Sequence, residues 1–181
     1  MKNLSMHIMD ILQNSIRAGA TEISLEIRED TLLNLLRFNI SDNGCGMAPD
    51  VLKTVTDPFF TTRTTRKVGL GLSLLRQNAE RSNGSLKIDS ETGKGTVVEA
   101  RFEYNHIDRP VLGDIAGTVL LTLTAHPEIQ FRYLHNRNGR SFELSTIALK
   151  DALCGIPINE PALYPTLLQM VKENLKDIDV N

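Results

Sequence analysis

Two polar residues, Asp10 and Asn14, stand one helical turn apart near the start of the chain. Residues at this spacing share one face of a helix, so a carboxylate and an amide would be presented together. An amide oxygen suits Mg²⁺, which usually keeps several water molecules and shares phosphate oxygens. A carboxylate one turn away could orient or deprotonate an attacking water or hydroxyl. The alternative interpretation is an ordinary solvated helix face.

A second candidate is the segment Asp42-Asn43-Gly44-Cys45-Gly46-Met47, which follows a predicted strand. A carboxylate at the end of a strand can accept a hydrogen bond from the amino group of an adenine ring. The two glycines would let the backbone pass close to a flat ring or a phosphate. Taken alone, the segment is equally compatible with a simple turn, and it lacks the spacing of a calcium-binding loop.

Two further segments carry glycines at places where a ligand could approach the backbone. Gly69-Leu70-Gly71-Leu72 stands where a loop is expected to enter a helix, and N–H groups at such a junction can bind an anion. Arg63, Arg66 and Lys67 precede it and add positive charge. Gly93-Lys94-Gly95-Thr96 lies between two predicted strands. An exposed basic loop and a plain hairpin turn are the respective alternatives.

Hydrophobic spacing and turn residues predict the elements that must position these groups. The expected order is helix 4–18, strands 23–27 and 36–40, helix 49–55, a helix from 69 or 70 to about 83, strands 85–90 and 96–103, helix 114–124, strands 129–134 and 141–144, and helices 146–153 and 162–175. Short turns between consecutive strands indicate an α+β fold, a two-layer sandwich. Its mixed, mostly antiparallel sheet would be covered by helices on one face.

A change of character near Arg109-Pro110 divides the chain. We expect a first domain over residues 1–105 and a small α/β C-terminal extension of unknown role over residues 106–181. The extension is too short for independent folding to be expected, so it should pack on the first sheet or on a partner.

Composition excludes several classes of protein. The chain has 181 residues with 20 basic and 22 acidic side chains, so no overall charge attracts it to nucleic acid. No apolar run is long enough for a membrane span, and the N-terminus lacks a signal-peptide core. Cys45 and Cys154 form neither a disulfide framework nor a paired metal site. We therefore expect a cytoplasmic protein without nucleic-acid or membrane partners, and its oligomeric state stays open.

The four motifs, taken in this order, resemble the ATP-binding domain of the GHKL superfamily. This superfamily comprises gyrase-type topoisomerases, heat-shock chaperones, histidine kinases and MutL mismatch-repair proteins. The resemblance covers residues 4–103. The part from Gln13 to Met47 is similar to MutL, and the part from Asp57 to Thr96 is similar to sensor histidine kinases.

The resemblance implies that the chain binds ATP together with Mg²⁺. By this comparison Asn14 would bind Mg²⁺, Asp42 would bind the adenine amino group, and Thr96 would support the adenine side. The other implied ATP-binding residues are Gly44, Gly46 and Met47 in the nucleotide loop, Gly69, Leu70, Gly71 and Leu72 near the phosphates, and Arg63 and Lys67, with Arg66, in a short lid.

Asp10 departs from the family pattern. ATP-hydrolysing members and anti-sigma serine kinases usually have glutamate at this position, and histidine kinases usually have asparagine. Aspartate keeps the carboxylate but is one methylene shorter than glutamate. Two roles are therefore open for Asp10: the catalytic base, or indirect support of Mg²⁺ and water.

The family resemblance leaves several outputs open. Few residues precede the first motif, and His7 does not sit in the phosphoacceptor pattern of histidine kinases. We therefore expect a slow ATPase or kinase-like switch that acts on a separate protein partner. A trans-acting serine/threonine kinase of the anti-sigma type is the first alternative. The second is a nucleotide-binding interaction module without turnover.

Overall fold

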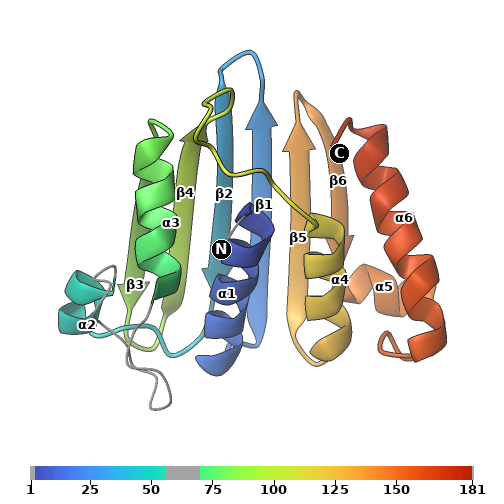
Figure 1. Cartoon of the computed structure of the whole chain (residues 1–181). Coiled ribbons are helices and arrows are strands. Elements are labelled where there is room, and N and C mark those ends of the chain that lie inside the picture. The colour runs from blue at the N-terminus through green and yellow to red at the C-terminus, as the bar shows by residue number, and fades with distance from the viewer. Residues whose placement is uncertain (1–2, 56–69, 181) are drawn as a thin grey trace.

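The computed structural model describes residues 3–55 and 70–180, and their strands form one mixed sheet (Figure 1). The strands are β1 (Glu22–Asp30), β2 (Leu35–Asp42), β3 (Ser85–Glu91), β4 (Gly95–Glu103), β5 (Gln130–Arg137) and β6 (Arg140–Ser145). Their order across the sheet is β3-β4-β2-β1-β5-β6. Neighbouring strands are antiparallel except β1 and β5, which are parallel. The predicted mixed, mostly antiparallel sheet is confirmed.

Helices cover one face of this sheet (Figure 1). They are α1 (Leu4–Arg17), α2 (Pro49–Thr54), α3 (Leu70–Arg81), α4 (Ile115–Ala125), α5 (Thr146–Ala152) and α6 (Tyr164–Asp177), with a short 3₁₀ turn at Pro161–Leu163. The helix α1 contacts both α3 and α4, and α6 packs against α4. The two-layer α+β architecture is thus confirmed. Within the described ranges, no helix has the length and apolar character needed to cross a membrane.

The helix α1 is fixed at both ends by the residues around it. Asn3 caps its start, because the Asn3 side-chain oxygen accepts a hydrogen bond from the Met6 N–H at 3.0 Å. Its end is followed by Gly19 at φ +73°, a left-handed conformation that glycine adopts without strain. The cap at Asn3 and the turn at Gly19 fix both ends of the helix that carries Asp10 and Asn14.

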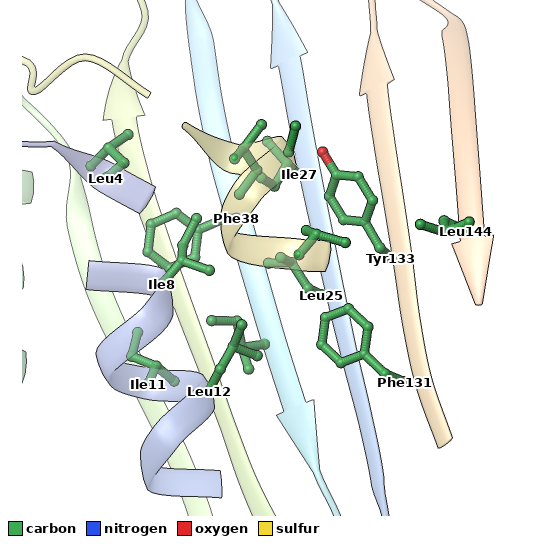
Figure 2. Close-up of a cluster of buried hydrophobic side chains, with 14 of the residues drawn as sticks. Leu4, Ile8, Ile11, Leu12, Leu25, Ile27, Phe38, Phe131, Tyr133 and Leu144 are labelled. Atoms are coloured by element: carbon green, nitrogen blue, oxygen red, sulfur yellow. The ribbon is translucent and has the colours of Figure 1, made fainter. Parts of the chain in front are cut away.

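The core lies between the helices and the sheet (Figure 2). Leu36, Phe38 and Ile40 alternate along β2 and are buried against the helices, as the sequence pattern predicts. Leu4, Ile8, Ile11 and Leu12 are the buried residues that α1 brings to this core. Because side chains alternate along a strand, the next residue of β2 on the helix side is Asp42. The apolar core therefore ends where this carboxylate begins.

The C-terminal extension joins the same sheet through a buried polar network between β1 and β5. Glu29 of β1 lies 2.8 Å from His135 Nε2 and accepts a 3.1 Å bond from Arg137. On the other side of the ring, the Tyr133 hydroxyl lies 2.7 Å from His135 Nδ1. The side chains of Glu29, Tyr133 and His135 are buried. The predicted boundary near residue 105 thus falls between elements that share one sheet.

We predict that Glu29→Gln destabilises the protein in a pH-dependent way. Burial raises the pKa of Glu29, but the His135 hydrogen bond and the His135 and Arg137 charges together hold it below its ordinary value. A lowered carboxylate pKa adds stability that is complete above the unfolded-state pKa and lost as pH falls through the folded-state pKa. Urea unfolding should therefore show a loss of about 3 kcal/mol in the variant at pH 7.

The difference between parent and Glu29→Gln should shrink as the pH is lowered to about 3. Glu143→Gln is the matched control, because the Glu143–Arg132 ion pair bridges neighbouring strands at an exposed position. An exposed pair contributes little to stability, so this variant should unfold almost like the parent. A Glu29→Gln difference that is the same at every pH would contradict the electrostatic explanation.

Candidate functional site

A row of polar side chains crosses three strands on the helix-covered face of the sheet. Asp42 of β2 is opposite Thr96 of β4, and Thr96 is opposite Ser90 of β3. The next row toward the core contains Ile40, Val98 and Ile88. The polar row lies at the end of the sheet where β2 ends and β4 begins, the lower end in Figure 1. It is therefore placed where a ligand could enter beside the core.

The Asp42 carboxylate is held by two hydrogen bonds from different elements. The Ser15 hydroxyl of α1 donates to one carboxylate oxygen at 2.6 Å, and the Gly44 N–H donates to the other at 2.9 Å. Ser15 is buried and Asp42 is half-buried. An ionised carboxylate has about four acceptor positions, so Asp42 can still accept hydrogen bonds from a ligand.

The loop after Asp42 is anchored to both sides of the site. Asn43 accepts hydrogen bonds from the N–H groups of Thr21 and Glu22, each at 2.9 Å, and its amide donates to the Thr21 hydroxyl. Cys45 donates its N–H to the Ala18 carbonyl and accepts a 2.8 Å bond from the Gly93 N–H. The loop is thereby tied to the end of α1 and to the β3–β4 turn. The Cys45 thiol is free and exposed.

Glycines in this loop and in the facing turn allow the close approach of two backbones. Gly46 has φ +64°, and a Cβ atom there would overlap the Glu91 carbonyl oxygen. Gly95 has φ +107°, and a Cβ atom there would overlap the Asp42 carbonyl oxygen. Both positions therefore require glycine, for conformation and for space.

Asp10 and Asn14 lie on one face of α1, one turn apart, as their spacing predicts. Both are half-buried. The Asn14 side-chain oxygen accepts a 3.1 Å hydrogen bond from Arg17.

The segment expected to contact phosphates is described only from residue 70 onward. Arg63, Lys67 and Gly69, together with Arg66, lie outside the described residues. Leu70 begins α3 at the same end of the sheet as the polar row (Figure 1). Gly71 and Leu72 occupy the first turn of α3, and the half-buried Leu72 packs against the hydrophobic core. Any ligand contact at Leu72 is therefore expected from its backbone.

His7 links α1 to α3 inside the molecule. Its Nε2 lies 3.0 Å from the Asn78 amide nitrogen, which can only donate, so Nε2 acts as the acceptor. Only 1% of the His7 side chain is exposed. Burial lowers the pKa of His7, even though the nearby Asp10 carboxylate raises it. His7 is thus a neutral, buried histidine.

Ser15 and Ser90 belong to no predicted set of site residues, although both contact candidate site residues. Ser15 follows Asn14 directly, but nothing in the local sequence connects it to Asp42. Ser90 could have been found from register, because a turn centred on Gly93 places residue 90 opposite residue 96. The site therefore depends on short polar side chains that carry no motif signal of their own.

Comparison with known proteins identifies relatives that match a part of the chain. Three similar proteins are a "Putative sensor protein" of Shewanella frigidimarina, 34% identical over 103 residues, the "Non-motile and phage-resistance protein" of Caulobacter vibrioides, 29% identical over 119 residues, and "Sensor histidine kinase ZraS" of Salmonella typhimurium, 32% identical over 96 residues. The matches cover 56%, 61% and 52% of this chain but only 16%, 14% and 20% of those proteins. The chain thus corresponds to one part of each relative.

Solved structures show the same fold. The N-terminal domain of a DNA repair protein matches with a TM-score of 0.55 and 18% identity, over 80% of this chain and 53% of that one. The Aquifex aeolicus MutL ATPase domain matches with a TM-score of 0.50 and 19% identity, over 84% of this chain and 68% of that one. A family model described as "Histidine kinase-, DNA gyrase B-, and HSP90-like ATPase" matches residues 2–106, more than half of the chain. The polar row, the glycine loop and the helix face of α1 all fall within this match, and the chain belongs to this ATPase family.

Proposed function

We propose that the protein binds ATP with Mg²⁺ and acts as a regulatory switch, a slow ATPase or kinase-like protein whose output is a separate protein partner. The observation that carries the proposal is the Asp42 carboxylate, held by Ser15 and Gly44 at the end of the core with acceptor positions left over. Membership of the ATPase family supports it. So does the fold match to a MutL ATPase domain that was solved with ADP.

Asp42 and Thr96 would recognise the adenine ring. Their Cα positions are paired across β2 and β4, so both side chains rise from the same face of the sheet. The 6-amino group of adenine donates hydrogen bonds, and Asp42 supplies an ionised acceptor for it. The apolar row of Ile40 and Val98 behind them would pack against the ring.

Asn14 and Asp10 would serve the phosphate end of the nucleotide. One amide oxygen beside one carboxylate is a donor set that fits Mg²⁺, because this ion keeps several waters and takes further ligands from phosphates. Asn14 would hold the ion, which supplies charge neutralisation at the phosphates when bound. A titration with a fluorescent ATP analogue, with and without Mg²⁺, tests both steps. Binding that ignores Mg²⁺ would argue against the Asn14 assignment.

We predict that Asp10→Asn lowers ATP turnover while leaving nucleotide affinity nearly unchanged. A positioned general base contributes about 10²- to 10⁴-fold to rate, and an amide cannot accept the proton. Asp10→Glu keeps the base and should retain turnover within about tenfold. Steady-state phosphate release at saturating ATP measures both variants. Equal turnover by the parent and Asp10→Asn would leave Asp10 with the supporting role only.

The burial and the hydrogen-bond partners of the histidines are consistent with a phosphoryl acceptor that lies outside the described residues or on another chain. All four histidines of the sequence are described. His7 and His135 are buried; Asn78 donates to His7 Nε2, and both ring nitrogens of His135 have hydrogen-bond partners. His126 is paired with Glu128, and His106 accepts a bond from the Asp108 N–H. Neither His106 nor His126 belongs to the candidate site.

A serine/threonine kinase acting in trans is the second candidate function. It is favoured by the carboxylate at Asp10, because a base near the phosphates could accept the proton of a partner hydroxyl. Labelled ATP added to a cell lysate would then label a protein in the presence of the parent but not of Asn14→Ala. Tight ATP binding with neither hydrolysis nor transfer would instead identify a nucleotide-binding interaction module.

A further inference from the structure

Ser90 of β3 makes three hydrogen bonds with its single hydroxyl group. The Met47 N–H lies 2.9 Å from the Ser90 oxygen, and the Gly95 carbonyl oxygen lies at the same distance. The third partner is the Thr96 hydroxyl, also at 2.9 Å. Ser90 is half-buried and sits directly opposite Thr96 in the sheet. The full hydrogen-bonding capacity of this hydroxyl is therefore in use.

The number of protons and lone pairs on each group fixes the direction of these hydrogen bonds. A serine hydroxyl has one proton to donate and two lone pairs to accept with. The Gly95 carbonyl cannot donate, so it takes the Ser90 proton. The Met47 N–H can only donate, so it uses one lone pair. The second lone pair must then accept the proton of Thr96, which leaves the Thr96 oxygen with acceptor positions only.

We propose that Ser90 is a specificity-determining residue. It leaves the purine end of the site lined only with hydrogen-bond acceptors. Asp42 and Thr96 stand side by side on one face, and both then offer only lone pairs to a ligand. A site lined only with acceptors favours a purine with an amino group at C6, bound directly or through one water. It disfavours a purine with a carbonyl there, because acceptor would face acceptor. The inference rests on the proposed nucleotide site and concerns its choice of base.

Without the Ser90 oxygen, Thr96 would regain a free proton. Its hydroxyl could then rotate and donate to a 6-carbonyl, while Asp42 would remain unchanged. The preference for ATP over inosine triphosphate, which carries the 6-carbonyl, should therefore fall. A net hydrogen bond is worth about 1 kcal/mol, so the ratio of the two dissociation constants should shrink by about fivefold in Ser90→Ala.

The ratio of the dissociation constants for ATP and inosine triphosphate separates a role of Ser90 in specificity from a merely structural role. Ser90→Ala also removes the partner of the Met47 N–H, and a loosened loop would weaken both nucleotides by the same factor. Competition titrations of ATP and inosine triphosphate against a fluorescent ATP analogue give the two constants. Ser85→Ala is the matched control, because Ser85 is an exposed residue at the other end of the same strand. Its ratio should equal that of the parent.

Two more variants complete the test. Ser90→Thr keeps the hydroxyl and should restore the parent ratio. In a Thr96→Val background, Ser90→Ala should leave the ratio unchanged, because no hydroxyl remains to be oriented. Ser90→Cys is nearly isosteric and weakens the hydrogen bonds. It should lower the ratio in the same direction, so it replaces Ser90→Ala if that variant does not fold.

The outcomes distinguish the inference from the function on which it rests. A parent protein that prefers ATP, together with a Ser90→Ala ratio reduced by about fivefold, supports the assignment. An unchanged ratio in a folded, ATP-binding Ser90→Ala or Ser90→Cys variant overturns it and leaves ATP binding intact. A parent protein that binds neither nucleotide overturns the proposed function and this inference together.

Discussion

Asp42→Asn is expected to weaken ATP binding by about 100-fold, which corresponds to about 2.8 kcal/mol. Both carboxylate oxygens of Asp42 already accept a hydrogen bond, from Ser15 and from the Gly44 N–H. Asparagine has only one acceptor oxygen, so its NH₂ group must face one of these donors or the amino group of the ligand. The Ser15 hydroxyl could accept from this NH₂ group by turning its proton to the Ile11 carbonyl at 3.3 Å. An NH₂ group that faces the Gly44 N–H or the amino group of the ligand sets donor against donor in a half-buried place, where an unmade hydrogen bond is costly.

A fluorescent ATP analogue titrated into the parent and the variant measures this loss. Asp89→Asn is the matched control, because Asp89 lies on β3, two strands away from Asp42, and pairs with Lys87 on the exposed face. That variant should bind like the parent. Thermal unfolding separates lost affinity from lost fold, since the Ser15 and Gly44 bonds also contribute to stability. Equal affinities for the parent and a folded Asp42→Asn variant would remove Asp42 from the adenine site.

The sequence predicts those parts of the site that depend on local pattern. Alternating Leu36, Phe38 and Ile40 define the buried face of β2, and the same alternation puts Asp42 on the helix side. The spacing of Asp10 and Asn14 gives their common face once α1 is a helix. The strands expected over 129–134 and 141–144 are found too, and the Asn138-Gly139 pair between them has the positive φ angles of a tight hairpin turn. Each of these follows from periodicity or from turn chemistry within a few residues.

Long-range pairing accounts for what the sequence does not reveal. Nothing local indicates that β5 lies parallel to β1, or that Glu29 meets His135 across that pair. The Ser15–Asp42 bond likewise joins residues from α1 and β2 that only the folded sheet brings together. Such contacts are set by the tertiary packing of whole elements. Sequence motifs therefore indicate the residues that would contact the ligand more readily than the residues that hold those side chains in position.

Gly95→Ala is expected to be the most damaging single-methyl change at the site. Gly95 is buried at φ +107°, where an L residue is strained, and the added Cβ would overlap the Asp42 carbonyl oxygen and approach the Asn43 Cα. Both neighbours are backbone atoms, so no side-chain rotation can relieve the overlap. The start of β4 would have to move away from the end of β2. We expect a loss of about 3 kcal/mol in unfolding free energy.

The same displacement should reach the ligand, because Gly95 immediately precedes Thr96. Separation of the two strands would pull Thr96 away from Asp42 and break the Ser90–Gly95 bond. ATP affinity should therefore fall by more than about tenfold in the fraction that remains folded, as a net loss of one to two hydrogen bonds implies. Urea unfolding and nucleotide titration on the same preparation give the two quantities.

Gly93→Ala separates backbone strain from backbone collision. Gly93 lies two residues earlier in the same turn at φ +80°, but a Cβ atom there meets no other atom within 4 Å. This variant incurs only the left-handed conformation, about 1 kcal/mol, and should leave ATP affinity unchanged. A similar loss of affinity in both variants would mean that turn conformation alone shapes the site. A loss confined to Gly95→Ala would show that ATP binding depends on the close contact between the start of β4 and the end of β2.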